Sequence, residues 1–263
     1  MKKIISLALM VVLLITFFSC ANKGFLREGV ISYQTYFADY DSMTELPLFN
    51  TSENRIWFSD SSVIYEIKII GIKTDHTSKG TFEKTSFDFF KYTYLDLRTM
   101  RCQDYFNLKD TAFPVNNYLL EIGHFAGWEF FTPKYPIDTS GIMSLLPDTI
   151  IDHKNYSRIK IKNNPDTLEF DYEFYLDCKT KNNMFHLNPT LDEMYPRCKV
   201  VRSIMKFKNY HFTTVFNTKI VADTLSKEEK TVFAKWAQNA IVTKLPLINY
   251  MEANKLTMQY RNY

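Results

Sequence analysis

The chain has 263 residues with an ordinary share of charged side chains and a high aromatic content, so it can bury the core of one large domain or two small ones. Its formal net charge of +3 includes two lysines, Lys2 and Lys3, that belong to an export leader. No basic run or stripe follows them, and we therefore expect no nucleic-acid partner.

The first nineteen residues have the parts of an export signal. The two lysines precede an apolar stretch, Ile4–Phe18, that is too short for a confident membrane span. The small residue Ser19 and then Cys20 follow directly. We predict that residues 1–19 are removed as a signal peptide. An uncleaved signal anchor and an ordinary signal peptide followed by a chance cysteine are the alternatives.

The end of this leader, Phe17-Phe18-Ser19-Cys20, resembles a lipobox. The resemblance implies that Cys20 begins the mature protein and carries a diacylglycerol thioether and an acylated amine. Two or more acyl chains make membrane attachment effectively permanent. Residues 20–28 would form the tether, which reaches at most about 30 Å when fully extended. The folded part is then expected close to the membrane surface.

From Gly29 onward the pattern is typical of β-strands. Ile31 and Tyr33 alternate with Ser32 and Gln34, and this period of two over aromatic and β-branched residues predicts a sheet. Asn, Asp, Ser and Pro clusters separate the strand-like runs, which predicts a meander of antiparallel strands. With no internal repeat or shift in composition, residues 29–263 are expected to form a single domain. The further runs are Asn54–Phe58, Ser62–Ile72, Phe87–Leu97, Cys102–Leu108, Ser157–Lys162, Thr167–Leu176, Lys199–Lys208 and His211–Val221.

One segment near the C-terminus predicts a helix over residues 226–242. Ser226 and Glu229 form a capping box, in which each side chain satisfies the backbone amide of the other residue. Val232, Phe233 and Trp236 then recur at helical spacing and form an apolar stripe, which fits a helix packed on a sheet. A second, shorter helix is considered within residues 116–124.

Three cysteines remain after lipidation: Cys102, Cys178 and Cys198. In an oxidising envelope one pair is expected, with one thiol left over. We favour a Cys178–Cys198 disulfide because these cysteines flank a polar segment, 179–197, that has the composition of a long connection. No C-x-x-C motif or paired histidine accompanies them, so we expect no metal site.

The chain shows no pattern that favours catalysis. Its five histidines are scattered, with none at i+2 or i+4 from another, and a G-x-S-x-G elbow and a glycine-rich phosphate loop are both missing. The adjacent carboxylates stand near turns and at the predicted helix start, where capping and solvation are their ordinary roles. We therefore predict no catalytic residue and no cofactor.

Aromatic residues gather in a stretch rich in loop-forming residues, at Phe125, Trp128, Phe130, Phe131 and Tyr135. If exposed, this group could stack on a sugar or dock a partner. If buried, it would plug the open end of a curved sheet.

A further signal is the recurrence of Asp followed by Ser or Thr and then an aliphatic residue. These triplets resemble the O-glycosylation acceptors of the Bacteroidota envelope, and they are also good turn chemistry between strands. The two interpretations are compatible because acceptors must lie on exposed loops. The hydroxyl residues concerned are Ser42, Thr111, Thr149, Thr167 and Thr224.

Together, the leader, Cys20, the triplets and the aromatic strands resemble a Bacteroidota lipoprotein. The opening Gly29-Val30-Ile31-Ser32-Tyr33 and the sheet-then-helix order resemble, more weakly, the GLPGLI group of envelope proteins and LolA-type half-barrels. The GLPGLI stretch itself is missing. The resemblance implies a curved antiparallel sheet, half-barrel or open barrel, with a C-terminal helix packed on it. It transfers no catalytic residue.

Three hypotheses follow. The leading one is a non-enzymatic outer-membrane lipoprotein that binds another envelope protein as an accessory subunit. The second is a carrier or sensor of acyl chains, which requires an unfilled, apolar sheet face. The third is a glycan-binding module that uses the Trp128 region.

Overall fold

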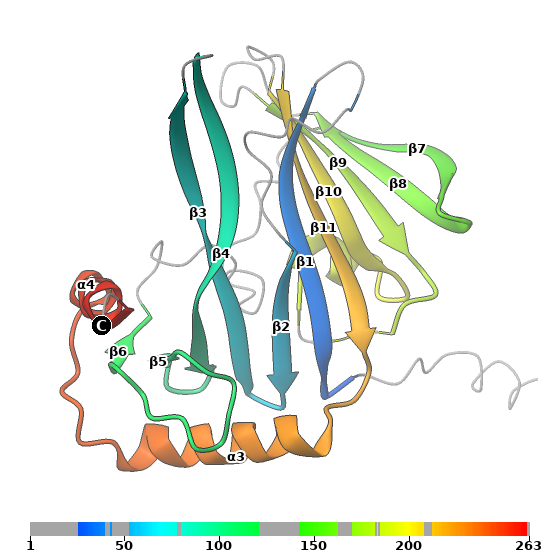
Figure 1. Cartoon of the computed structure of the whole chain (residues 1–263). Helices are drawn as coiled ribbons and strands as arrows, with labels where there is room; N and C mark the ends of the chain where they lie inside the picture. Colours follow the sequence, from blue (N-terminus) through cyan, green and yellow to red (C-terminus); the bar gives the residue numbers. More distant parts are fainter. Residues whose placement is uncertain are drawn as a thin grey trace, which may run out of the picture.

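The computed structural model describes residues 26–39, 43, 53–77, 80–120, 142–162, 170–181, 183, 185–207 and 212–261, with the backbone alone at 69–77, 80–88, 170, 189, 212, 260 and 261. The chain folds into one curved, unclosed antiparallel sheet of eleven strands (Figure 1). The strands are β1 (Glu28–Asp39), β2 (Asn54–Ser59), β3 (Ser62–Thr77), β4 (Gly80–Asp96), β5 (Arg101–Tyr105), β6 (Tyr118–Leu119), β7 (Ile142–Ile151), β8 (Lys154–Lys162), β9 (Phe170–Asp177), β10 (Lys199–Phe207) and β11 (Phe212–Ala222). The predicted fold class is therefore confirmed.

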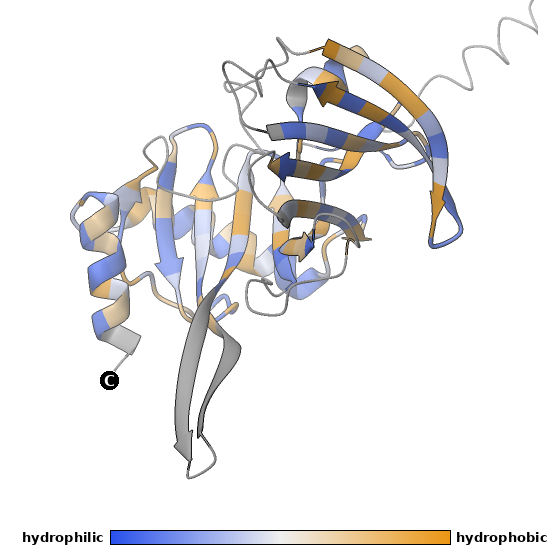
Figure 2. Cartoon of the chain, turned by 90° about the horizontal axis from the view of Figure 1, so that it is seen from above, coloured by the Kyte–Doolittle hydropathy of each residue, from blue (hydrophilic) through white to orange (hydrophobic). Residues whose placement is uncertain are grey.

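The order of the strands follows the chain except at one place. The sheet runs β6-β5-β4-β3-β2-β1-β11-β10-β9-β8-β7, so the first and last strands lie side by side at its centre. β1 pairs with β11 from Val30↔Ala222 to Asp39↔Phe212. A meander of strands extends to each side of this central pair, and the β1–β11 pairing joins the two meanders into one sheet. Figure 2 shows them from above.

Alternation along the strands gives the sheet two buried faces. One face carries the largest apolar cluster, which extends from Ile159 and Ile161 on β8 to Tyr118 on β6. It is covered by residues 183–198, which include the short helix α2 (Pro189–Met194), and by α4 (Tyr250–Arg261). Over the described residues, side chains therefore cover most of this face, and a cavity opens beside Ile31, Phe185 and Ile220.

The opposite face is covered in part by α3 (Lys227–Val242), which runs across one end of the strands (Figure 1). Ser226 and Glu229 form the predicted capping box. Trp236 is fully buried, stacks on Tyr105 with ring centroids 3.7 Å apart, and donates a hydrogen bond to the Lys109 carbonyl oxygen at 3.0 Å. The prediction of a helix that packs on the sheet is confirmed.

Four elements lie outside the sequence predictions: β6, β7, α2 and α4. The helix considered within residues 116–124 is wrong for residues 116–120, which are extended and include β6. The contacts of Asn116 explain this. Its side chain accepts a hydrogen bond from the Asp104 backbone amide at 3.1 Å and donates one to the Ala253 carbonyl oxygen. These bonds tie the segment to α4.

Candidate functional site

Several of the predicted site residues lie outside the described residues. These are the lipidation residue Cys20, the aromatic group Phe125, Trp128, Phe130, Phe131 and Tyr135, and the acceptors Ser42 and Thr167. Of the other acceptors, Thr111 and Thr224 are exposed outside the strands, whereas Thr149 is half-buried within β7. Exposure is what glycosylation of Thr111 and Thr224 would require.

The structure joins Cys178 to Cys198 in a disulfide, the pair that the sequence analysis favours. The bridge closes a loop that contains α2 and holds it against the start of β10. The remaining thiol, Cys102, is buried in the large core cluster, and burial raises its pKa well above the ordinary range. A thiol of this kind is inert toward nucleophilic chemistry.

A polar network centred on the buried pair Lys91 and Asp104 joins α4 to the sheet. Lys91 and Asp104 form an ion pair at 2.7 Å, with side chains 2% and 0% exposed. Asp104 also accepts hydrogen bonds from Thr93, Asn116, Tyr118 and Thr257, and the second partner of Lys91 is Asn254 on α4. Because Asp104 is satisfied by side chains of the fold and has no solvent access, this network is structural.

A second buried ion pair lies in the disulfide loop. Lys199 and Asp192 are 2.9 Å apart, and both side chains are about 95% buried. The Asp192 carboxylate also accepts the Val200 amide at 3.0 Å, while Lys199 donates to the Asn183 carbonyl oxygen at 3.3 Å. His186 completes the group, with its Nδ1 2.8 Å from Asp192. These contacts fix the loop wall that borders a cavity.

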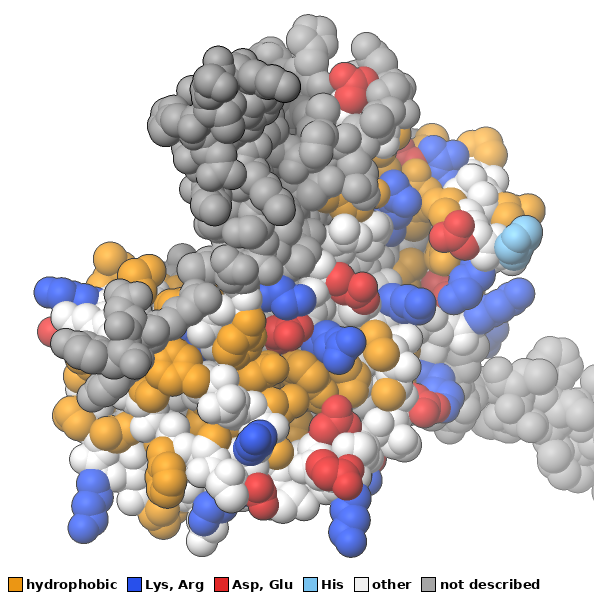
Figure 3. Space-filling view, in the orientation of Figure 1, with side chains coloured by type: hydrophobic (Ala, Val, Ile, Leu, Met, Phe, Trp, Pro, Cys, Tyr) orange, Lys and Arg blue, Asp and Glu red, His pale blue; other side chains and the backbone are white. Residues whose placement is uncertain are grey.

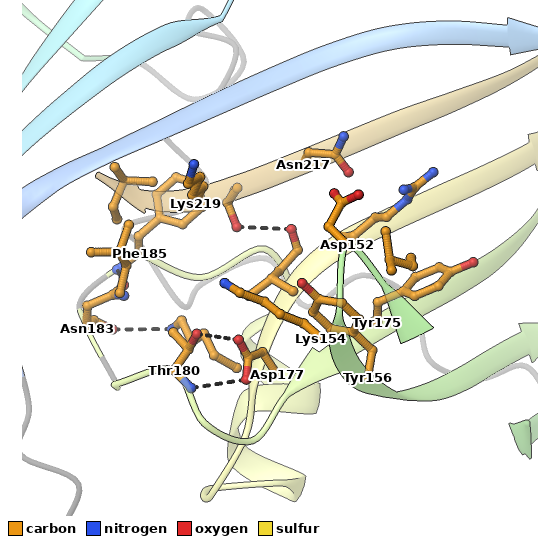
Figure 4. Close-up of a pocket in the computed structure, with 17 residues that line it drawn as sticks. Asp152, Lys154, Tyr156, Tyr175, Asp177, Thr180, Asn183, Phe185, Asn217 and Lys219 are labelled. Carbon is orange, nitrogen blue, oxygen red and sulfur yellow. Dashed lines mark hydrogen bonds between the residues drawn. The ribbon is translucent and has the colours of Figure 1, made fainter. Parts of the chain in front are cut away.

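That cavity, of about 400 Å³, lies where the sheet splays open. β10 and β11 pair only from Arg202↔Asn217 to Lys206↔Thr213. Beyond Arg202 the two strands separate, and Thr218 spans the gap by donating to the Val201 carbonyl oxygen at 3.1 Å. We call this cavity the slot (Figure 4). Residues of β1, the end of β7, β8 to β11, the β7–β8 turn and the disulfide loop line it.

Aromatic and charged side chains form one wall of the slot. The Tyr175 ring lies between two guanidinium groups, with Arg158 and Arg202 at 5.6 and 5.4 Å from its centroid. Burial and the neighbouring Glu173 carboxylate raise the pKa of Tyr175 to about 12, so the phenol stays neutral. Both faces of this ring are therefore occupied by the protein itself.

The edge of the sheet beside the slot is strand β7, which is unusually open. Ile142, Leu145 and Ile150 are 77%, 72% and 73% exposed. Figure 3 shows hydrophobic side chains at this outer part of the molecule, beyond the mixed acidic and basic side chains over β8 to β10. Long apolar edge strands are the usual templates for pairing with another chain.

Sequence reasoning missed both the slot and this edge. The signal for β7 is present in the apolar residues 142–146, but Pro147 and Asp148 directly after them have turn chemistry. In the structure they form a bulge, since the pairing of β7 with β8 shifts between Leu146 and Thr149. The slot has no local signal, because it arises from two strands separating.

No protein-family model matches this chain, and no curated protein matches it either. None of the helices in the described part of the chain is long and apolar enough to cross a bilayer. Across that same part, no group of His, Cys, Asp and Glu side chains is arranged to hold a metal ion.

Proposed function

We propose that this chain is a non-enzymatic lipoprotein of the bacterial envelope, of the Bacteroidota type, anchored in the outer membrane through Cys20. It serves as an accessory subunit that binds a partner protein, and the partner adds a strand to β7. The observation that carries the docking proposal is the exposure of Ile142 and Leu145 on an edge strand that ends the sheet. Backbone groups along such an edge supply affinity, and side-chain pockets supply specificity.

The first half of β7 is a better template for a partner strand than the second half. Residues 142–146 pair with β8 without interruption, whereas the bulge at Pro147 interrupts the second half. Five residues match the usual length of a strand. A partner strand is therefore expected against residues 142–146.

The two faces of β7 define the chemistry of that partner. On one face, Met143 and Leu145 lie opposite Ile161 and Ile159 of the core, so the core cluster continues to the open edge. On the other face, Ser144 lies opposite Lys160, and Ile142 and Leu146 stand on either side of it, opposite Lys162 and Arg158. Lys160 is 38% exposed, and its Nζ is 3.8 Å from an Asp171 carboxylate oxygen. The fitting partner strand is mainly apolar, with an acidic side chain at the position that faces Ser144 and Lys160.

The other two hypotheses receive less support. An acyl carrier requires an open apolar face, whereas most of the large cluster is covered by the described residues of the disulfide loop and by α4. The slot opens beside Ile31, Phe185 and Ile220 of that cluster, but charged side chains line it as well. The glycan hypothesis depends on Trp128, which lies outside the described residues, so it stays a prediction.

The test is affinity purification of the tagged, full-length protein from native membranes. Leu145→Lys should reduce the recovered partner by about tenfold or more, equivalent to at least about 1.4 kcal/mol, because a charge would enter the apolar face of the new pairing. Lys160→Glu should also reduce the amount of partner recovered, because the new carboxylate would repel an acidic side chain of the partner strand.

The matched control is Ile241→Lys, which changes an equally exposed apolar residue on α3, 81% exposed. The Leu145 and Ile241 variants should melt like the parent protein, whereas Lys160→Glu places a carboxylate opposite Glu173 and should melt at a lower temperature. Equal recovery of the partner by the Leu145 and Ile241 variants would exclude β7 as the docking edge.

A further inference from the structure

We propose that the slot binds a small organic anion, with one carboxylate or phosphate group on a polar body about the size of a monosaccharide. The slot contains none of residues 142–146 of β7, so this proposal can be tested independently of the docking proposal. It rests on the shape of the splayed sheet and on the charges that line it.

The shape comes from the separation of β10 and β11. Each strand keeps its other neighbour, since β10 continues to pair with β9 as far as Lys199 and β11 with β1 as far as Ala222. The Thr218 hydroxyl bridges the facing edges by donating to the Val201 carbonyl oxygen. The slot is therefore bordered by strand edges, whose backbone groups are polar, and Phe185 and Ile220 add apolar side chains to its lining. A cavity of about 400 Å³ is within the range of small-molecule sites.

The lining has an excess of positive charge. Four basic side chains line the slot, Lys154, Lys199, Arg202 and Lys219, against two acidic ones, Asp152 and Asp177. An occupant with negative charge would balance this excess, whereas a neutral apolar occupant would desolvate it.

Not all of these charges are available to a ligand. Lys199 is held by Asp192, and Arg202 lies on the Tyr175 ring. Asp177 accepts hydrogen bonds from the Thr180 hydroxyl at 2.7 Å and from the Lys179 and Thr180 amides. The Asp177 carboxylate is therefore already satisfied by hydrogen bonds from its own loop.

The cations best placed to bind are Lys154 and Lys219. Both are exposed, and neither has an ion pair with a carboxylate within the described ranges at the distances of a salt bridge. They come from the β7–β8 turn and from β11, and Figure 4 shows them on different sides of the cavity. Asn183 and Asn217 also line the cavity and add amide groups to its wall. Two separated ammonium groups in a wall that also carries amides suit an anion that bears hydroxyl groups.

The turn that carries Lys154 is fixed in place. Asp152 and His153 both have left-handed backbone conformations, with φ of 49° and 63°, as a two-residue hairpin turn requires. The pairing Ile151↔Lys154 closes that turn. Lys154 is therefore held at the mouth of the slot by a tight turn instead of a long loop.

The test is titration calorimetry of the full-length protein in detergent with three probes: D-glucuronate, inorganic phosphate and the neutral D-glucose. At least one anion should bind saturably at about ten millimolar or below, and glucose should not. Binding should weaken as salt is added, because the contacts are between charges. If phosphate binds as tightly as glucuronate, a phosphate group is the recognised feature. If glucuronate binds more tightly than phosphate, the carboxylate and hydroxyl groups are the recognised features.

Two variants locate the site. Lys154→Gln and Lys219→Gln should each weaken anion binding by about tenfold. Lys219→Gln should leave the melting temperature unchanged, whereas Lys154→Gln should lower it slightly, because Lys154 also stabilises the Asp177 carboxylate. The control Lys235→Gln, on the exposed face of α3, should bind like the parent protein. The proposal is overturned if neither anion binds, if glucose binds equally well, or if the slot variants bind as tightly as the control.

Discussion

The buried charges of Lys91 and Asp104, beneath α4, stabilise this fold as an ion pair. Asp104 receives five side-chain hydrogen bonds, whereas Lys91 has one other hydrogen-bond partner, Asn254. Hydrogen bonds therefore satisfy Asp104 more fully than they satisfy Lys91. Removal of Lys91 leaves a carboxylate that is still satisfied, whereas removal of the Asp104 charge leaves an uncompensated buried ammonium.

We predict that Asp104→Asn lowers the free energy of unfolding by about 3–5 kcal/mol, and that Lys91→Met lowers it by clearly less. Denaturant unfolding of the two variants measures both values. The opposite order would show that Lys91 is the better satisfied partner.

Asp177, in the wall of the slot, makes stability depend on pH. Burial raises the pKa of its carboxyl, but the Thr180 hydroxyl, the Lys179 and Thr180 amides and the Lys154 ammonium outweigh that effect and hold the pKa below its ordinary value. A carboxyl whose pKa is lower in the folded state stabilises the fold above its unfolded pKa. That contribution is lost as the pH falls through the folded pKa.

We therefore predict that wild type and Asp177→Asn differ most in unfolding free energy above about pH 4, and that the difference closes at lower pH. Urea unfolding across the acid range measures it. A difference that stays constant as the pH falls would mean that the lost hydrogen bonds, and not the charge, account for the effect of the substitution.

Among the elements, α3 is stabilised by packing more than by its cap. The helix is too short to be stable alone in water, so its stability comes from burying Val232, Phe233 and Trp236. We predict that Trp236→Ala costs about 3–5 kcal/mol and Ser226→Ala only about 1 kcal/mol. Thermal unfolding of the isolated protein compares them. If truncation of Trp236 scarcely changes the melting temperature, α3 is a docking helix instead of a structural one.

The elements also show what sequence could predict. The α3 helix was predictable because its capping box and apolar stripe are local. α2 carries a usable local signal, since Asn188 caps it and Pro189 begins it, but it lies within the disulfide loop and is only six residues long. The placement of α4 depends on Asn254 and Thr257, whose partners stand more than a hundred residues earlier. No local pattern encodes those contacts.

At the scale of the whole molecule, antiparallel strands were predictable but their order was not. The alternation from Ile31 onward indicates a sheet with buried faces. That β1 lies beside β11 depends on pairing across almost the entire chain, and the slot depends on where β10 and β11 part. The candidate sites are products of that topology, which explains why motif analysis did not find them.

Anchoring is a property of the whole molecule too. We predict that Cys20→Ser moves the protein from the membrane fraction to the soluble fraction, because the acyl chains can no longer be attached. Fractionation with metabolic fatty-acid labelling tests this. Fatty-acid label on the variant would show that the lipid is attached elsewhere.

The central claim is that β7 docks a partner strand, and the most direct measurement is photocrosslinking in intact cells. A photoreactive phenylalanine analogue replaces Leu145 in one strain and Ile241 in another. Both residues are exposed in the isolated chain, at 72% and 81%. We predict that position 145 crosslinks to a single envelope protein, through a mainly apolar segment that carries an acidic residue, and that position 241 does not. The same crosslinked products from both positions, or none from position 145, would contradict the proposal.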